Sequence, residues 1–573
     1  MTEVELDESQ FAIADGRANR RHLVLAGPGT GKTTTAIALT SAILEASDDN
    51  EMVLFVSFSN AALAAAGSHF DELAEGLSDR VIAVTLDSLA GQLVESERGE
   101  DVKPRFDDII RAATSYVSGD DYDGELDDVI HLVVDEAQDL SACRRQLLLT
   151  LIERLPDDVG FTIFGDPMQS LYGFLDDDSP DAWVSLKEAL EAQHDLVEST
   201  LTGDYRSSSG LTRRVSAALA DVRTANATNS EIEAALDSAL IDVPSTTPEH
   251  VARQIGKWQG STAVLTRTNL EAVEVVDVLL RAGVQTVLVS AGPEHSVIDR
   301  WVADLYFFCD GESVTRERFE AASAALPEVD ASWFDDLLLS SNSQSRINWS
   351  NLHAATRRWS RSPRHWHQNT KNYVTVSTVH QAKGREFDNV VIVEPRSLLR
   401  STGQSDSPEF EVLYVALTRA RSRVYAMSWP KQFTRRAHDR VRTGYRTHPG
   451  TKALTAVQIS PDDLRPDRDF VDRGSPPALD EVSAGATIEF ERLTSTDRPS
   501  YRCTLNGRTV GVTTDDFGDR LRTLNRGKNW PDLGPVPIES VATASTSDDV
   551  STAFWTIPRP RGFSTVSYRK QER

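Results

Sequence analysis

The feature that most constrains the fold is a glycine-rich turn between an apolar stretch and a helical stretch. Residues 27–33 read Gly-Pro-Gly-Thr-Gly-Lys-Thr and directly follow the apolar residues 23–26. Glycines let backbone N–H groups turn toward a phosphate, and the N-terminus of the following helix adds positive potential. In a strand–turn–helix context this pattern predicts a phosphate-binding loop that includes Gly27, Gly29 and Gly31.

Two side chains at the end of this loop are predicted to carry chemistry. We expect Lys32 to reach the β- and γ-phosphates of a nucleotide and the hydroxyl of Thr33 to hold Mg²⁺. Ala26 stands where the strict pattern has glycine. The structural alternative is a glycine-rich turn that binds nothing, and Gly-Lys-Thr in this setting argues against it. The sequence therefore predicts a site for ATP and Mg²⁺.

An acidic pair lies at the end of another apolar stretch. Asp135 and Glu136 follow Val133 and Val134 in the sequence Val-Val-Asp-Glu-Ala-Gln-Asp. A carboxylate at the end of a buried strand can hold Mg²⁺, directly or through water, so we expect Asp135 to share the ion with Thr33. Glu136 is then placed to accept a proton from the attacking water. A solvated acidic strand end is the alternative, and the phosphate loop weighs against it.

Short apolar stretches alternate with helical ones along most of the chain. Nearly continuous apolar strands between helices indicate parallel sheets that helices cover on both faces. The stretches that we predict as strands are residues 23–26, 52–58, 81–86, 130–134, 161–164, 262–265, 286–289, 374–376 and 390–393. The predicted fold class is therefore α/β with two parallel-sheet lobes.

Breaks in this rhythm suggest the domain boundaries. The first lobe is predicted over residues 1–200, with a small polar insertion at about 92–128. The second lobe is predicted over residues 201–455, with a helical insertion at about 292–371. After it, Gly, Pro, Thr and Asp become frequent and short alternating stretches appear, which predicts a separate, mainly β domain over residues 465–573.

The charge balance argues against a basic surface overall. The 573 residues carry a formal net charge of −27, whereas phosphate contacts need Lys and Arg. Net charge governs long-range approach, however, and a local basic groove can coexist with it. No apolar stretch reaches 18 residues, the acidic N-terminus lacks a signal-peptide pattern, and the three cysteines are widely separated. We therefore expect a cytoplasmic protein with reduced thiols and no membrane contact.

Further motifs accompany these two sites in a fixed order along the chain. They are Leu-Asp-Glu-Ser-Gln (6–10), Phe-Ser-Asn (58–60), Gly-Asp-Pro-Met-Gln-Ser-Leu-Tyr-Gly-Phe (165–174), Tyr-Arg-Ser (205–207), Thr-Val-His-Gln-Ala-Lys-Gly-Arg-Glu-Phe (378–387) and Tyr-Val-Ala-Leu-Thr-Arg-Ala (414–420). This series resembles the UvrD/PcrA/Rep branch of the superfamily 1 helicases over roughly residues 1–430. The resemblance implies two RecA-like P-loop lobes that hydrolyse ATP and act on DNA.

The resemblance also assigns residues to the nucleoside. Gln10 would read adenine, since an amide can pair with both the N6 donor and the N7 acceptor. Tyr205 would stack on the adenine, and Glu386, which follows the glycine turn at Gly384, would bind the ribose. Thr34, in the first turn after the phosphate loop, stands where relatives often have an arginine that stacks on adenine.

Three further residues would act on the transferring phosphoryl group. By resemblance, Gln169 would sense the γ-phosphate and position water. Arg206 and Arg419 would act as arginine fingers that stabilise its charge. Arginines on one lobe that reach a nucleotide on the other make a cleft close on ATP and open after hydrolysis. Such a cycle can ratchet the lobes along a strand.

The family pattern places DNA-binding side chains at five positions, namely Phe58, Asn60, Tyr172, Phe174 and His380. Aromatic rings among them would stack on bases, which contributes roughly 1–3 kcal/mol per base. The alternatives are a core aromatic and a buried or helix-capping histidine.

Some residues depart from the family pattern. Thr85-Leu86-Asp87-Ser88 stands where relatives usually have Thr-Phe-His beside the strand, and a carboxylate there would repel phosphate. Glu411 stands where a basic residue is common. Both insertions are also much shorter than those of the well-known repair helicases, so strand separation is less secure than ATP hydrolysis and translocation.

These observations support one function and leave two alternatives. The first is an ATP-dependent translocase or helicase that moves 3′ to 5′ on single-stranded DNA, also at duplex junctions, in repair, recombination or defence. The second is a helicase-like regulatory ATPase that senses DNA ends and licenses a partner nuclease or repair protein. The third is a non-enzymatic nucleotide-binding scaffold, against which the intact Lys32, Glu136 and Gln169 count.

A basic and aromatic stretch at residues 357–367 could supply the groove that the net charge lacks; a solvated helix face with buried tryptophans is the alternative. If it binds the strand, replacing Arg357, Arg361 and Arg364 by alanine will flatten the dependence of DNA affinity on salt, by roughly 0.7 in log–log slope per lost phosphate contact. Titrations at several salt concentrations measure the slope, and an unchanged slope contradicts the assignment.

Overall fold

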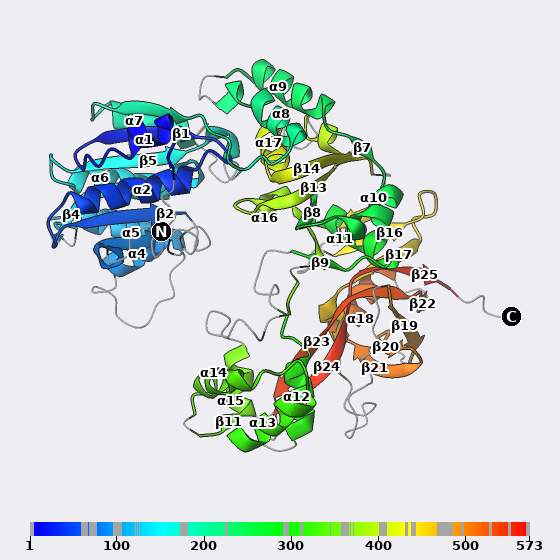
Figure 1. The fold of residues 1–573 in the computed structure, drawn as a ribbon. Helices are drawn as coiled ribbons and strands as arrows, with labels where there is room; N and C mark the ends of the chain where they lie inside the picture. The colour runs from blue at the N-terminus through cyan, green and yellow to red at the C-terminus, as the bar shows by residue number, and fades with distance from the viewer. Residues whose placement is uncertain are drawn as a thin grey trace. The chain divides into compact units, whose positions relative to one another are not determined.

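Figure 1 shows the computed structural model of the chain. The residues that the structure describes are 5–58, 63, 67, 77–94, 106–120, 122, 124, 126–171, 182–223, 227–289, 297–309, 313–343, 345–356, 366, 368–370, 372–399, 409–429, 434–436, 443–466, 485–493, 498–525, 530–547 and 552–568. They divide into two compact units. Unit 1 comprises Met1–Pro244, Ala382–Val390 and Pro395–Ala426, and unit 2 comprises Ser245–Gln381, Val391–Glu394 and Met427–Arg573.

Unit 1 contains a six-stranded parallel sheet with the order β3-β2-β4-β5-β1-β6 (Figure 1). Its strands are β1 (Arg21–Ala26), β2 (Met52–Ser57), β3 (Val81–Thr85), β4 (Val129–Asp135), β5 (Gly160–Gly165) and β6 (Val197–Leu201). The first five confirm the predicted strands. The sixth, β6, was missed because its burial pattern is mostly exposed, so it lacks an apolar stretch.

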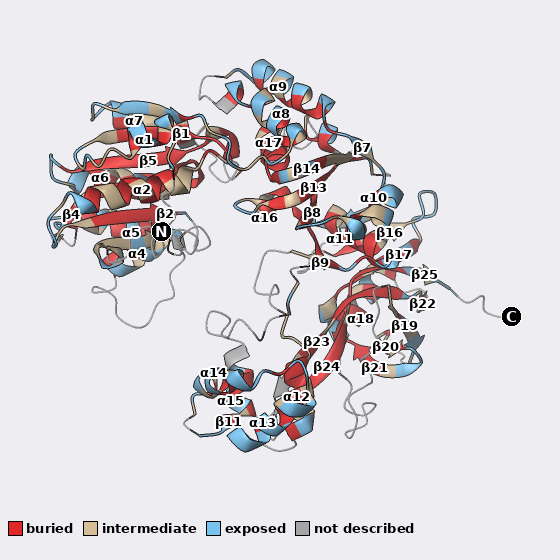
Figure 2. Cartoon of the chain, viewed as in Figure 1, coloured by how far each residue is buried: buried red, intermediate tan, exposed pale blue. Residues whose placement is uncertain are grey.

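The sheet separates two hydrophobic cores, because successive side chains of a strand point to opposite faces. Along β2, Val53 and Phe55 belong to one core, while Leu54 and Val56 belong to the other. The first core is closed by α1 (Glu8–Ile13) and α2 (Lys32–Glu45). The second is closed by α4 (Leu86–Leu93), α5 (Phe106–Ser118), α6 (Ala142–Arg154) and α7 (Ala182–Glu191). Figure 2 shows the resulting buried strands between helices with exposed outer faces.

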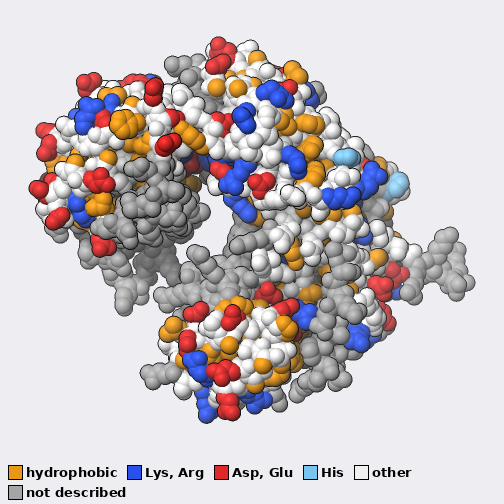
Figure 3. Space-filling view, viewed as in Figure 1, with side chains coloured by type: hydrophobic (Ala, Val, Ile, Leu, Met, Phe, Trp, Pro, Cys, Tyr) orange, Lys and Arg blue, Asp and Glu red, His pale blue; other side chains and the backbone are white. Residues whose placement is uncertain are grey.

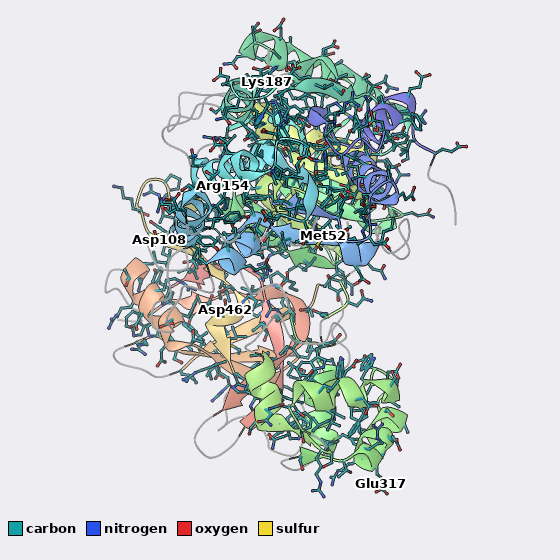
Figure 4. The ribbon with its side chains drawn as sticks, turned by 90° about the vertical axis from the view of Figure 1, so that its left-hand side faces the viewer. Met52, Asp108, Arg154, Lys187, Glu317 and Asp462 are labelled. Carbon is teal, nitrogen blue, oxygen red and sulfur yellow. The ribbon has the colours of Figure 1, made fainter. Side chains whose placement is uncertain are left out.

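The predicted insertion at about 92–128 contributes to this second core. Its helix α5 buries Ile110, Ala113 and Val117 in that core. At the end of α6, the guanidinium of Arg154, labelled in Figure 4, donates to the carbonyl oxygens of Val117 and Gly119 at 2.6 Å each. A cation at the last carbonyls of a helix satisfies them and opposes the negative end of the helix dipole.

A second six-stranded sheet has the order β7-β14-β13-β8-β12-β9. The strands are β7 (Ser245–Thr246), β8 (Thr262–Thr266), β9 (Thr286–Leu288), β12 (Val374–Thr378), β13 (Phe387–Val393) and β14 (Ala420–Met427). Strand β12 is parallel to both β8 and β9. The predicted strands in this half of the chain are confirmed, as is the α/β fold with two parallel-sheet lobes. The helices that precede and separate these strands in the sequence are α8 (Gly210–Ala218), α9 (Asn229–Ile241), α10 (Pro248–Gln254), α11 (Asn269–Arg281), α16 (Val379–Ala382) and α17 (Phe410–Leu417).

The C-terminal part of unit 2 is mainly antiparallel β structure, as predicted. One sheet has the order β15-β16-β17-β25-β22 and another the order β18-β21-β20-β19-β23-β24. The strands are β15 (Thr434–Arg436), β16 (Gly444–Thr447), β17 (Leu454–Ile459), β18 (Leu464–Arg465), β19 (Thr487–Arg492), β20 (Tyr501–Leu505), β21 (Arg508–Thr513), β22 (Asp532–Leu533), β23 (Val536–Ser547), β24 (Thr552–Pro560) and β25 (Gly562–Ser567), with one helix, α18 (Asp515–Asn525). Strand β17, which precedes residue 465, pairs with β25 near the end of the chain.

The helical insertion at about 292–371 shares a core with the long hairpin of β23 and β24. Its helices are α12 (Trp301–Cys309), α13 (Arg316–Ala325), α14 (Phe334–Ser340) and α15 (Trp349–Thr356). Phe554 of β24 is fully buried among them and contacts the rings of Tyr306 and Trp349 at 5.6 and 5.4 Å between centroids. Thr543 of β23 donates its hydroxyl to the carbonyl oxygen of Asp299 at 2.7 Å.

Buried carboxylates connect the C-terminal strands to the rest of unit 2. Glu539 accepts from the backbone N–H of Leu288 at 2.8 Å and from the guanidinium of Arg561 at 2.9 Å. Asp277 of α11 accepts from the backbone N–H of Phe563 at 3.2 Å. A buried charge that lost its partner would be strongly destabilising, so these contacts fix the register of the packing. Within the described residues, no helix is long and apolar enough to cross a membrane.

Two histidines are buried at the centre of the first sheet. His131 is fully buried, with Nδ1 2.7 Å from the carbonyl oxygen of Ala18 and Nε2 3.0 Å from the hydroxyl of Thr162. One proton on Nδ1 satisfies both contacts, so the neutral ring fits the site. Burial lowers the pKa of His131, and that of His22, to about 4.

Because the pKa of His131 is near 6.5 in the unfolded chain, the unfolded state takes up a proton between pH 6.5 and 4 and the folded state does not. The stability of unit 1 should therefore fall with decreasing pH, by about 2 kcal/mol at pH 5 from His131 alone. We predict that His131→Gln loses this part of the decrease in thermal midpoint between pH 7.5 and 5, measured by calorimetry. The exposed His250 gives a control, since His250→Gln should retain the full decrease. An unchanged pH dependence in His131→Gln contradicts the prediction.

Candidate nucleotide site

The phosphate loop connects β1 to α2 in the predicted strand–turn–helix arrangement. Gly29 and Gly31 have φ angles of +76° and +78°, which side-chain-bearing residues rarely adopt. Inside the loop, the hydroxyl of Thr30 donates to the carbonyl oxygen of Gly27 at 2.8 Å. Helix α2 starts at Lys32, so the N–H groups of its first turn point back toward the space that the loop surrounds. This geometry suits an anion.

Neighbouring segments approach the loop so closely that Gly29 and Gly31 have no room for a side chain. A Cβ atom on Gly29 would lie 2.6 Å from the Cβ of Arg206. A Cβ atom on Gly31 would lie 2.2 Å from Nε2 of Gln10. The loop thus brings together residues from three predicted motifs.

The acidic pair lies beside the loop at the end of β4. Nζ of Lys32 is 2.6 Å from Oε1 of Glu136 and 3.5 Å from Oδ1 of Asp135. The hydroxyl of Thr33 donates to Oδ2 of Asp135 at 3.4 Å. A hydroxyl and a buried carboxylate at this separation are the oxygen ligands that Mg²⁺ prefers, so the residues present fit the ion.

Lys32 and the two carboxylates shift each other's pKa values. Burial alone would lower the pKa of Lys32, but the carboxylates of Glu136 and Asp135 outweigh it and raise that pKa. Burial would also raise the pKa of Glu136, but the ammonium groups of Lys32 and Lys383 outweigh it and lower the pKa to about 2. Glu136 adopts φ +60°, a left-handed conformation that costs energy for a residue with a side chain. This turn directs the carboxylate toward Lys32.

A chain of hydrogen bonds leads away from Glu136. The amide of Gln138 donates to Oε2 of Glu136 at 2.5 Å, and its oxygen accepts from the backbone N–H of Asp166 at 3.0 Å. The carboxylate of Asp166 accepts from the amide of Gln169 at 2.8 Å and from the hydroxyl of Tyr414 at 3.1 Å. Gln169 is therefore connected to Glu136 through two side chains that the sequence analysis did not select.

Arg419 completes this chain. Its guanidinium donates to Oε1 of Gln169 at 3.1 Å and to the carbonyl oxygen of Val415 at 3.1 Å. The side chain is only 2% exposed, and burial lowers its pKa to about 10. An arginine stays charged at neutral pH even so, and its planar fork can hold two acceptors in fixed positions.

Arg206 lies beside the phosphate loop and is held by a second set of contacts. Its guanidinium donates to the carbonyl oxygen of Thr418 at 2.8 Å and lies 2.5 Å from the carboxylate of Glu386. Glu386 also accepts from Arg421 at 2.9 Å. Burial would raise the pKa of Glu386, but the two arginines outweigh it and lower that pKa. The predicted ribose ligand and one predicted arginine finger thus form an ion pair.

Tyr205 and Gln10 border the other side of the loop. The backbone N–H of Tyr205 donates to the carbonyl oxygen of Gly29 at 2.8 Å, while its ring is 58% exposed. Gln10 is buried, and its amide donates to the carbonyl oxygen of Thr30 at 3.2 Å. The ring and the amide predicted to hold adenine therefore lie next to each other. Thr34 lies half-buried in the first turn of α2.

Lys383 is a further site residue that the sequence analysis missed. Its ammonium contacts both the carboxylate of Asp139 and the backbone carbonyl oxygen of Gln169. Burial raises the pKa of Asp139 to about 6, although Lys383 opposes this shift. Asp139 and Lys383 both lie inside motifs of the sequence (133–139 and 378–387), but no pattern in the sequence indicates that they contact each other. Gly384, the next residue, has φ +74° and forms the turn toward Glu386.

The predicted DNA-binding residues are only partly described. Phe58 follows β2 directly and is 37% exposed. His380 lies in α16, half-buried, in unit 2. Asn60, Tyr172 and Phe174 lie outside the described residues, as do Arg357, Arg361 and Arg364.

Asp87, the carboxylate that departs from the family pattern in the first lobe, forms an ion pair with Arg144. Asp87 accepts from both Nε and Nη2 of Arg144 at 2.8 and 2.9 Å, and Arg144 also contacts Asp107 at 3.4 Å. A bidentate pair of this kind offsets the negative charge of Asp87 locally. On the face drawn in Figure 3, acidic side chains lie scattered among basic ones, which agrees with a net charge spread over the surface.

Comparisons with known proteins match two segments of the chain to protein families. The AAA domain family matches residues 9–175, which include the phosphate loop and the acidic pair, and the UvrD-like helicase C-terminal domain family matches residues 373–427, which include Arg419. The comparison with curated proteins gives no match. A crystal structure of the Pif1 helicase from Candida albicans is similar with a TM-score of 0.38 and 13% identity, over 74% of this chain and 96% of that chain. The two matched segments are similar to these families, which supports the resemblance to the UvrD-like superfamily 1 helicases.

Proposed function

We propose that the chain is a DNA-dependent ATPase that translocates 3′ to 5′ along single-stranded DNA and acts in repair, recombination or defence. The observation that carries the proposal is the continuous hydrogen-bonded path from Lys32 and Glu136 to Arg419. A simple nucleotide-binding scaffold has no need of a buried arginine joined to a carboxylate beside the phosphate loop. Polarity and pathway come from the resemblance alone.

In this proposal the phosphates of ATP lie on the loop, with Lys32 at the β- and γ-phosphates. Thr33 and Asp135 would hold Mg²⁺, which neutralises charge on the phosphate oxygens. Glu136 would accept the proton of the attacking water. Because Lys32 lowers the pKa of Glu136, the carboxylate becomes a stronger base when Lys32 turns toward phosphate.

The arginines would connect hydrolysis to movement. Arg419 and Gln169 share one hydrogen bond, so a γ-phosphate that draws either side chain must move the other. Arg206 would leave Glu386 for the phosphate, which frees that carboxylate for the ribose. Release of phosphate reverses both exchanges, and such a two-state change at the nucleotide can drive a step along a strand.

Single-stranded DNA is the proposed partner, with Phe58 as a stacking side chain exposed at the end of β2. Asn60, Tyr172, Phe174 and His380 are proposed to share this role. Unwinding of duplex junctions and cooperation with a nuclease or repair protein in the cytoplasm remain proposals of the same kind.

We predict that Glu136→Gln lowers kcat for ATP hydrolysis by at least about 100-fold, because general-base catalysis is lost while phosphate contacts remain. The native protein should hydrolyse ATP faster with single-stranded DNA. Steady-state assays with and without DNA measure both effects, and Glu45→Gln, at the exposed end of α2, is the control. Full activity of Glu136→Gln contradicts the role of this residue, and absent stimulation by DNA contradicts the motor.

We further predict that Arg419→Lys lowers kcat by about 1,000-fold or more with little change in KM, since an ammonium keeps the charge but lacks the fork. Combining it with Gln169→Ala should cost much less than the product of the two single effects, because the residues act through one hydrogen bond. Single-turnover kinetics separate the chemical step from binding. Arg213→Lys on α8 is the matched control, and independent effects of Arg419 and Gln169 would count against the coupling.

A further inference from the structure

The carboxylate of Asp7 joins the N-terminal helix to the exposed ring of Tyr205. One oxygen, Oδ1, accepts from the backbone N–H of Gln10 at 2.8 Å and from the hydroxyl of Ser9 at 2.7 Å, and so caps α1. The other, Oδ2, accepts from the hydroxyl of Tyr205 at 2.6 Å. The two residues are 198 positions apart in the sequence.

Both ends of Tyr205 are thus fixed at the nucleotide site. Its backbone is bound to Gly29 of the phosphate loop, and its hydroxyl is bound to Asp7. A Cβ atom on Gly203 would lie 2.6 Å from the Tyr205 ring and 2.9 Å from the Asp7 carboxylate, so the absence of a side chain there permits the approach. Because the ring is 58% exposed, packing holds only part of it, and the tether at the hydroxyl limits its rotation.

Asp7 also orients the amide that lies beside this ring. Its backbone N–H donates to Oε1 of Gln10 at 3.1 Å, while Nε2 of Gln10 donates to the carbonyl oxygen of Thr30. A flipped amide would place donor against donor and acceptor against acceptor, so these contacts determine its orientation. Oε1 of Gln10 also lies 3.4 Å from the hydroxyl of Tyr205, which donates mainly to Asp7 at 2.6 Å. A base with a neighbouring donor and acceptor, such as adenine, would pair with the amide by replacing this long contact at Oε1 and by using the second N–H of Nε2.

We propose that Asp7 is a positioning residue for the nucleotide base, which holds the Tyr205 ring and the Gln10 amide in place before ATP binds. This inference rests on the proposed nucleotide site and concerns only its base-binding side. The hydrogen bond with Asp7 raises the pKa of Tyr205 to about 12, so the phenol stays protonated and keeps donating. A preorganised ring and amide lose less conformational freedom on binding, and this increases affinity.

The test compares ligands with and without a base. Asp7→Ser should keep the helix cap but lacks the second oxygen, Oδ2, which accepts from Tyr205, and Tyr205→Phe keeps the ring but cannot donate. Affinity for ATP is measured at equilibrium by competition against a fluorescent ATP analogue, so turnover is not needed. Inorganic tripolyphosphate is the second competitor, since it can occupy the phosphate loop but has no base. Glu8→Gln, one exposed residue further on, is the matched control.

We expect each variant to bind ATP roughly five- to tenfold more weakly and tripolyphosphate as the native protein does. The double variant should be no weaker than the single ones. Gly203→Ala, which forces the ring and the carboxylate apart, should act in the same direction even if Asp7→Ser folds poorly.

Two results would overturn the inference. One is unchanged ATP affinity in Tyr205→Phe and Gly203→Ala. The other is an equal loss for tripolyphosphate, which would mean that Asp7 acts through the loop. Native protein that binds ATP in this base-dependent way but does not hydrolyse it would contradict the proposed motor and leave the role of Asp7 standing.

Discussion

The ion pair between Lys32 and Glu136 is the contact on which the nucleotide site depends. Burying either charge alone would cost several kcal/mol, so the start of α2 and the end of β4 must come together for the first lobe to close. The left-handed backbone of Glu136 is part of the same constraint, since its strain is tolerated only where the surrounding contacts compensate for it. Gln138 then links the carboxylate of Glu136 to the backbone N–H of Asp166 by two hydrogen bonds. The carboxylate of Asp166 accepts from the hydroxyl of Tyr414, which lies in the segment that bears Arg419.

The sequence was informative wherever a residue's task is local. The existence of the predicted strands, the glycine turn and the closeness of Lys32 to Glu136 follow from short patterns, whereas several strand ends differ by one to three residues. The connections between motifs could not be predicted in the same way. Tyr414 meets Asp166 across 248 residues and Arg419 meets Gln169 across 250, and no periodicity records such pairings. Gln138 looked like one polar residue among several, because its two contacts exist only after the sheet has formed.

The C-terminal part shows the same limit on a larger scale. Alternating apolar residues predicted its strands correctly, because that pattern reflects which face is buried. The pattern does not identify a partner strand, and the pairing of β17 with β25 joins segments about 100 residues apart. The burial of Glu539 beside Leu288 and Arg561 was likewise invisible, since a glutamate in a strand is usually exposed.

The position of Phe554 inside the helical insertion has a consequence for how the protein is made. The last helix around it, α15, ends at Thr356, so a ribosome must add about 200 more residues before this ring is available, which takes roughly 10–40 s. During that interval Tyr306 and Trp349 lack the aromatic partner around which they pack. The first lobe has no such dependence, because its sheet and helices are complete by residue 201. The nascent chain should therefore carry a finished N-terminal lobe while the helical insertion still awaits the last hairpin.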